Sequence, residues 1–183
     1  MPIKAIVILA EGFEEIEAVT CIDVLRRAGI EVVVAGLNDL KVKAARNTLV
    51  LADKKLDDAG ADFDACILPG GMPGAGNLAG SRAVNTLIKD MAAKNKLIAA
   101  ICAAPPVVLI PTGVLKNRSA TCYPGMNGSF GKDTVYKPAS VVIDNNIITA
   151  SGPATAMVFA LAIVEKLCGK SVVDKLKKAL LVT

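Results

Sequence analysis

The fold is decided by one stretch of the chain, Leu97-Ile98-Ala99-Ala100-Ile101-Cys102-Ala103-Ala104-Pro105-Pro106. Its first five residues are apolar without alternation, which is typical of a strand buried on both faces of a parallel sheet. Prolines are tolerated in the first turn of a helix, because their missing N–H group would have no partner there. The stretch therefore predicts a tight strand-to-helix turn with Cys102 at its tip.

Cys102 at such a turn has the geometry of a nucleophile elbow, with Cys in place of Ser and without the flanking Gly-x-Ser-x-Gly signature. Free backbone N–H groups and the positive end of the helix dipole would favour the thiolate over the thiol. The alternative is that Cys102 is a small buried hydrophobic residue, as most free cysteines are.

The composition indicates one soluble α/β domain over residues 1–183, with 53% hydrophobic, 21% charged and 3% aromatic residues. No apolar run approaches the roughly 18 residues that span a bilayer, and the N-terminus has no signal-peptide pattern. Five cysteines without paired spacing favour a reducing compartment, so we expect a cytoplasmic protein. The net charge of +4 is spread along the chain, which argues against specific nucleic-acid binding.

The chain contains no histidine. Mechanisms that need an imidazole are therefore excluded, including Ser-His-Asp and Cys-His catalysis and His-ligated zinc. A second copy of the chain cannot supply one either. Any catalytic base must be a carboxylate, Tyr, Lys, another Cys, water or the substrate.

Apolar runs predict five core strands, at residues 3–9, 31–35, 65–68, 97–101 and 147–150. Helical spacing and capping residues predict helices at 14–28, 81–93, 152–167 and 171–181, and residues 41–51 indicate a hairpin or an edge excursion. Residues 119–146 are expected to form short strands and loops. The short connections of the first strand–helix–strand unit favour a parallel sheet.

A glycine-rich loop at residues 69–76 follows the third core strand, at the edge where α/β proteins bind ligands. Residues 74–80 resemble a dinucleotide fingerprint, but the third glycine is one place late and nucleotide binding is disfavoured. No Cys-x-x-Cys pair is present, so we expect no metal site and no cofactor.

Two further side chains could take part in chemistry at Cys102. Glu17 falls at the start of the first helix, at the same sheet edge as Cys102, where a carboxyl group in a partly apolar crevice would stay protonated. A solvated helix glutamate is the alternative. Cys122 could resolve an oxidised Cys102, although a residue at the end of a strand is the favoured interpretation.

Taken together, these segments resemble the ThiJ/PfpI superfamily, in the branch of the Parkinson-linked protein deglycase. The similarity runs from Ile3 to the C-terminus with the same element order. The residues that carry it are Ile8-Leu9-Ala10, Gly12, Glu14-Glu15-Ile16-Glu17, Asp23, Arg26-Arg27-Ala28-Gly29-Ile30, Leu68-Pro69-Gly70-Gly71, Ala99-Ala100-Ile101-Cys102-Ala103 and Gly152-Pro153.

The resemblance implies a flavodoxin-like three-layer sandwich of the class I glutamine amidotransferase type, and a homodimer that packs partly through the first helix. It implies Cys102 as nucleophile, Glu17 as its protonated partner, and backbone N–H groups of Gly71 and Ala103 as an oxyanion hole. Candidate substrate or anion contacts are Arg46, Gly70, Tyr123 and Ser151. Tyr123 stands where many relatives have histidine, and Ser151 replaces a second arginine.

Two functions from different classes follow. The first is a cofactor-free glyoxalase or deglycase that converts methylglyoxal or glyoxal, free or as early glycation adducts on side chains, to hydroxy acids. The second is a non-enzymatic oxidative-stress sensor or redox chaperone that acts through oxidation of Cys102. A glutaminase-like domain that feeds ammonia to a partner is weaker, because it would need histidine.

Overall fold

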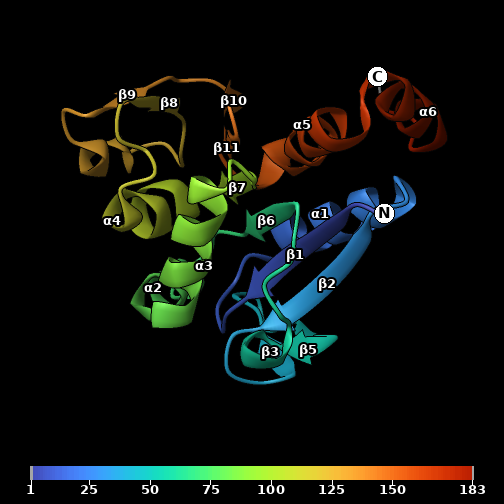
Figure 1. The fold of residues 1–183 in the computed structure, drawn as a ribbon, viewed down its shortest axis with the longest axis horizontal. Coiled ribbons are helices and arrows are strands. Elements are labelled where there is room, and N and C mark those ends of the chain that lie inside the picture. Colours follow the sequence, from blue (N-terminus) through green and yellow to red (C-terminus); the bar gives the residue numbers. More distant parts are fainter. Residues whose placement is uncertain (1, 183) are drawn as a thin grey trace.

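A seven-stranded sheet runs through the centre of the structure, which is a computed structural model that describes residues 2–182 (Figure 1). Neighbouring strands pair in parallel except at the antiparallel β10–β11 edge. In spatial order the strands are β10 (Val141–Asp144), β11 (Ile147–Ala150), β7 (Leu97–Ile101), β6 (Ala65–Leu68), β1 (Lys4–Leu9), β2 (Glu31–Gly36) and β5 (Lys54–Lys55).

The five predicted core strands are confirmed as β1, β2, β6, β7 and β11, and β5 and β10 extend the sheet at its edges. Across the sheet the core strands follow the order 2-1-3-4-5, which is the flavodoxin-like order. The order reverses between β1 and β6. Ligand sites of such sheets lie at this point, outside the carboxyl ends of the strands.

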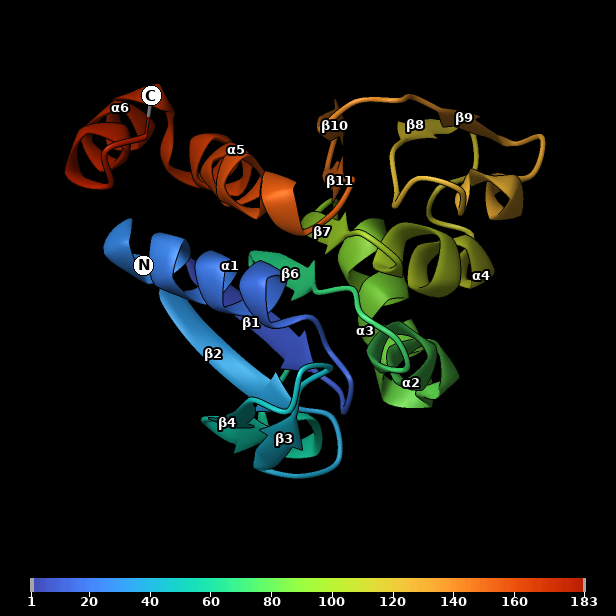
Figure 2. The ribbon, with the colours of Figure 1, turned by 180° about the vertical axis from the view of Figure 1, so that it is seen from behind.

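Helices cover both faces of the sheet, which confirms the three-layer sandwich (Figure 1 and Figure 2). Alternate residues of β1 point to opposite faces: Val7 packs in the cluster with α1 and α5, whereas Ile6 packs in the cluster with α2 and α3. One layer consists of α1 (Glu15–Arg27), α5 (Ala156–Cys168) and α6 (Lys170–Ala179); the other consists of α2 (Gly74–Gly80), α3 (Arg82–Ala93), a π-helical turn (Pro105–Leu109) and α4 (Ile110–Thr112).

Capping residues begin α1 and α3 within one residue of the predicted starts. In contrast, α5 begins at Ala156 after a 3₁₀ turn and not at residue 152, and α6 covers Lys170–Ala179 and not 171–181. Glu14 caps α1 by accepting a hydrogen bond of 2.9 Å from the N–H group of Glu17, and Gly29 follows its end at φ +81°. Ser81 caps α3 by accepting one of 3.3 Å from the N–H group of Val84.

The glycine-rich loop is shorter than the sequence predicts, because α2 begins at Gly74. A Cβ atom at Gly74 would lie 2.6 Å from the backbone nitrogen of Phe13. Glycine therefore lets the start of α2 pack directly on the turn between β1 and α1, and the turn next to Cys102 is built from residues 69–73.

Two small excursions complete the chain. The predicted hairpin forms from β3 (Lys41–Lys43) and β4 (Leu49–Leu51), and the irregular region contains the parallel pair β8 (Arg118–Ala120) and β9 (Thr134–Tyr136). Short 3₁₀ turns lie at Leu56–Asp58, Asn127–Phe130 and Pro153–Thr155. Within residues 2–182, no helix is long and apolar enough to cross a membrane.

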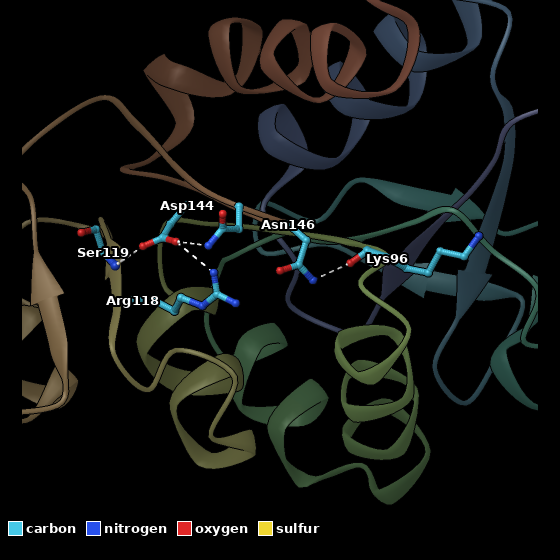
Figure 3. Close-up of polar contacts among 6 residues, drawn as sticks. Lys96, Arg118, Ser119, Asp144 and Asn146 are labelled. Atoms are coloured by element: carbon cyan, nitrogen blue, oxygen red, sulfur yellow. Dashed lines mark hydrogen bonds and ion pairs between the residues drawn. The ribbon is translucent and has the colours of Figure 1, made fainter.

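A polar network ties the β8 excursion to the sheet (Figure 3). Asp144 at the end of β10 accepts hydrogen bonds from the Ser119 N–H group at 2.7 Å and from Nη1 of Arg118 at 3.0 Å. Asn146 donates through Nδ2 to the carbonyl oxygen of Lys96 at 2.9 Å. The first two bonds anchor the segment before Cys122 and Tyr123 to β10, and the third holds the β10–β11 turn against the residue that precedes β7.

Candidate active site

Cys102 lies at the tip of the turn after β7 and adopts a left-handed backbone conformation, with φ of +64°. A non-glycine residue in this region is strained and persists only where its surroundings hold it. Its N–H group donates to the carbonyl oxygen of Ala150, and its own carbonyl oxygen accepts from the Tyr123 N–H group, both at 2.9 Å. The predicted nucleophile elbow is therefore present, and the two neighbouring segments hold it in place.

Glu17 is fully buried in the first turn of α1 and faces the same turn. Its Oε2 accepts a hydrogen bond of 2.7 Å from the N–H group of Gly70, while its buried Oε1 has no well-aligned protein partner. A Cβ atom at Gly70 would lie 2.7 Å from Cβ of Cys102 and 2.9 Å from Oε2 of Glu17. Both functional side chains thus converge on the space that Gly70 leaves open, and the solvated-glutamate alternative is wrong.

The N–H groups of Gly71 and Ala103 act on the sulfur of Cys102 and lower its pKa. Gly71 has φ of +86°, and a Cβ atom there would lie 2.6 Å from the carbonyl oxygen of Gly12 and from the nitrogen of Glu14. The glycine is therefore required by its backbone conformation and by the β1–α1 turn packed against it.

Glu17 and Cys102 form a coupled acid pair. Burial raises the pKa of Glu17 to about 7, against the lowering effect of the Gly70 and Cys102 hydrogen bonds. Burial and then the Glu17 charge raise the pKa of Cys102 to about 12, against the lowering effect of the Gly71 and Ala103 N–H groups. The pair thus loses one proton near pH 7 and keeps the second until far higher pH.

The sequence analysis expected the turn to lower the pKa of Cys102, and the structure corrects this. The N–H groups do act in the expected direction, but burial of the sulfur and the nearby carboxylate outweigh them. Above about pH 7 the pair carries one negative charge and one proton. With that proton on Glu17, the repulsive charge is gone and the two N–H groups face a thiolate.

The other expected contacts are Gly70, Tyr123, Ser151 and Arg46, and the structure gives each of them different neighbours. Gly70 binds the carboxyl group of Glu17. Tyr123 is half exposed, and its ring edge lies against Gly152, where a Cβ atom would be 3.4 Å from Cδ2. Ser151 follows Ala150 and donates its N–H group to Ser140. Arg46 is exposed on the β3–β4 turn, which Glu15 holds through a 2.6 Å bond to the Arg46 N–H group.

Cys122 does not fit the role of a resolving thiol. It is fully buried on the face that carries α2 and α3, whereas Cys102 belongs to the cluster on the opposite face. Its sulfur lies 3.5 Å from the carbonyl oxygen of Tyr123, and burial raises its pKa to about 11. A buried thiol of this kind is unreactive.

Ala150 is a site residue that the sequence analysis did not single out, although its carbonyl oxygen holds the N–H group of Cys102. The sequence feature that could have identified Ala150 is the pairing of two predicted strands. Strand β11 lies beside β7, and both strands end at this turn. Among residues 2–182, no group of three or more His, Cys, Asp or Glu side chains is arranged to hold a metal ion.

The fold and the elbow define a class: flavodoxin-like α/β proteins that place a cysteine at the strand-to-helix turn and a buried carboxyl group beside it. Within that class the chain belongs to the DJ-1/PfpI family, whose sequence profile matches residues 3–166. This confirms the superfamily that the sequence motifs indicate.

Three relatives illustrate the similarity. Drosophila melanogaster dj-1beta is 45% identical over 182 residues, which cover 98% of this chain and 97% of that protein. Its crystal structure matches with a TM-score of 0.96 and 44% identity over 100% of both chains. Oxidized Toxoplasma gondii DJ-1 matches with a TM-score of 0.95 and 41% identity over 98% of both chains. The Caenorhabditis elegans protein named glutathione-independent glyoxalase DJR-1.2 is 37% identical over 171 residues, 93% of this chain and 91% of that protein.

Proposed function

We propose that this protein is a cysteine-dependent, glutathione-independent glyoxalase that converts methylglyoxal or glyoxal to hydroxy acids, with early glycation adducts on side chains as further substrates. The observation that carries the proposal is the convergence of Cys102 and Glu17 on the space left by Gly70. A relative that is 37% identical bears the name of this activity. The chemistry needs one nucleophile and one proton carrier, which this pair supplies.

The reaction starts when the Cys102 thiolate adds to the aldehyde carbon of methylglyoxal, and Glu17 protonates the new alkoxide to give a hemithioacetal. Glu17 then removes the proton from that carbon to give an enediolate. The hydroxyl proton on the same carbon moves to the neighbouring oxygen, and Glu17 returns its proton to the neighbouring carbon. The product is a thioester of lactate. Water hydrolyses it, which releases lactate and restores the thiol, so that one water is consumed per turnover.

The surroundings have separate roles in this scheme. The N–H groups of Gly71 and Ala103 stabilise negative charge at the reacting sulfur and oxygen. We infer that Tyr123 after β8, Ser151 after β11 and Arg46 on the β3–β4 turn contact the substrate or its anionic product.

The test is lactate formation from methylglyoxal by the purified protein without added metal or thiol. We expect many turnovers per subunit, lost in Cys102→Ser and kept in the control Cys168→Ser, which alters a partly buried cysteine at the end of α5. If the wild type makes no lactate, or if Cys102→Ser makes as much, the proposed function is wrong.

A redox sensor is the second candidate, and a specific observation favours it: a relative with a TM-score of 0.95 has been solved in an oxidized form. In this alternative, peroxide converts Cys102 to a sulfenic or sulfinic acid and Glu17 hydrogen-bonds the product. Turnover separates the two functions, because a sensor thiol is consumed once per subunit.

We also propose a homodimer that packs through α1. The helix exposes Ile16 and Val19, and the neighbouring hairpin exposes Leu49 and Leu51, which are 61% and 70% accessible. An apolar surface of this kind on α1 and β4 is typical of a subunit interface. Light scattering coupled to gel filtration measures the mass, and we expect Ile16→Asp to shift it from dimer to monomer.

A further inference from the structure

A hollow on the α3 side of the molecule shares no residue with the Cys102 site. It has a volume of about 450 Å³ and lies between the segment after β5 and one face of α3. The first wall contributes Leu56, Asp57, Gly60 and Ala61, and the second contributes Arg82, Ala83, Thr86, Leu87 and Asp90. This volume falls within the range of small-molecule sites, roughly 300–1,000 Å³.

The floor of the hollow is apolar. The hollow exists because small residues line its walls. Leu56 and Leu87 lie at the bottom with accessibilities of 7% and 9%. Gly60, Ala61 and Ala83 line the walls, and a Cβ atom at Gly60 would meet nothing within 4 Å. An apolar group of a ligand would therefore contact this floor without displacing any of the lining side chains.

The rim carries charges that have no partner within the protein. Asp57, Asp90 and Arg82 form no ion pair or side-chain hydrogen bond among residues 2–182. Arg82 and Asp90 are eight positions apart in α3, which separates them by about 12 Å along the helix axis. Two carboxylates and one guanidinium leave the rim with an excess of negative charge.

A second hollow, at the amino ends of the strands, differs in this respect. Its charged lining residues are Asp64, Lys96, Arg118 and Lys166. Lys96 pairs with Asp64 at 2.7 Å, and Arg118 pairs with Asp144 at 3.0 Å, the second pair being drawn in Figure 3. The remaining charge, Lys166, is positive. Charges that are already neutralised within the protein offer little to a ligand. The unpaired rim around an apolar floor makes the α3 hollow the better site.

We propose that the α3 hollow binds a small amphipathic amine, with its apolar body on Leu56 and Leu87 and its ammonium group between Asp57 and Asp90. Arg82, at the other end of the hollow, donates to a hydroxyl or carbonyl oxygen of the ligand. The proposal is independent of the chemistry at Cys102, because the two sites share no residue.

The test is an NMR titration of the full chain with phenylbutylamine, and with phenylbutanol and phenylbutyrate as neutral and anionic analogues. We expect the amine to give saturable shifts in the amide signals of residues 56–61 and 82–90, and the analogues to give none. Asp57→Asn and Asp90→Asn should each weaken binding roughly fivefold, which corresponds to one partly exposed charge contact.

Ala83→Trp should abolish the shifts, because the indole fills the hollow from an exposed helix position that tolerates it. Asp133→Asn, at an exposed carboxylate before β9, is the charge-matched control and should bind like the wild type. The proposal fails if phenylbutanol or phenylbutyrate binds as well as the amine. It also fails if Ala83→Trp still binds, if Asp133→Asn weakens binding equally, or if no amide signal moves.

Discussion

The N–H group of Gly70 donates a 2.7 Å hydrogen bond to Oε2 of Glu17, so the turn after β6 holds the carboxyl group that faces Cys102. Three connections meet here: the turn after β1 leads into Glu17, the turn after β6 contains Gly70, and the turn after β7 carries Cys102. The site is therefore a direct product of parallel strand order, because the carboxyl ends of β1, β6 and β7 are neighbours.

Gly70→Ala should separate the acid pair. The added methyl group would lie 2.7 Å from Cβ of Cys102 and 2.9 Å from the carbonyl oxygen of Ile101, so that backbone must shift. We expect a loss of about 1–3 kcal/mol in the free energy of unfolding, typical of overpacking, together with loss of Cys102 reactivity. Urea denaturation measures the first and alkylation the second.

Gly80→Ala is the matched control for this substitution. Gly80 ends α2, and a Cβ atom there meets nothing within 4 Å, so we expect unchanged stability and unchanged alkylation. If Gly70→Ala and Gly80→Ala lose the same stability, the loss in Gly70→Ala does not come from the close approach of Gly70 to Cys102 and Ile101.

Glu17→Gln should change how stability depends on pH. The native state raises the pKa of Glu17 from 4.5 to about 7, so the native state holds a proton that the unfolded chain has released. Stability from this group is therefore complete below pH 4.5 and is lost as the pH rises to about 7, by about 3 kcal/mol in total.

The variant lacks this titration. Relative to the wild type, Glu17→Gln should gain stability between pH 5 and pH 8, measured as the difference between urea denaturation curves at about these two values. Wild-type and variant stabilities that stay parallel across this interval would show that Glu17 ionises as freely in the native state as in the unfolded chain.

The reactivity of Cys102 should follow the acid pair and not an isolated thiol. The pair loses its first proton near the pKa of Glu17, about 7, and its second near that of Cys102, about 12. Alkylation of Cys102 by iodoacetamide, read by mass spectrometry, should rise through about pH 7 and then level off. In Glu17→Gln the pH midpoint of alkylation should move upward. Burial still raises the pKa of the Cys102 thiol, and the thiol no longer has a neighbouring carboxylate that can accept its proton. Equal midpoints in the two proteins would contradict the coupling.

Much of this site can be predicted from the sequence, because it depends on local patterns. The apolar run before Cys102 and the prolines after it predict the elbow, and the acidic start of the first helix places Glu17 at the same edge of a parallel sheet. The α/β sandwich follows from the same apolar runs. These features need only the order of strands and helices along the chain.

Other features depend on packing that no local pattern shows. The direction of the Cys102 pKa shift is set by burial and by the Glu17 charge, and both arise only when α1 packs beside the elbow. Cys122 follows β8 in a segment without clear alternation, so the face on which its thiol packs could not be predicted. Gly70 was expected to contact substrate, whereas its N–H group holds Glu17.

Asp144→Asn should loosen the excursion that carries Tyr123. The Ser119 N–H group, and then Arg118, hold the pKa of Asp144 below its usual value of 3.8 (Figure 3). Its stability contribution is therefore present above pH 3.8 and is lost as the pH falls through the lower native pKa. We expect the variant to lose about 1 kcal/mol at neutral pH and nothing in acid. Asp174→Asn removes an exposed helix ion pair with Lys170 and should have the same free energy of unfolding as the wild type, both at neutral pH and in acid.

Peroxide should oxidise Cys102 without forming a disulfide to Cys122. The two thiols pack on opposite faces of the sheet, and Cys122 is fully buried, so a bond between them would require the elbow to break its hydrogen bonds to Ala150 and Tyr123. Mass spectrometry of treated protein should show oxygen added at Cys102, to the same extent in Cys122→Ser as in the wild type. Cys102→Ser should take up no oxygen at this position. A mass loss of two hydrogens in the wild type that is absent from Cys122→Ser would mean that the elbow opens far enough in solution for the sulfurs to meet.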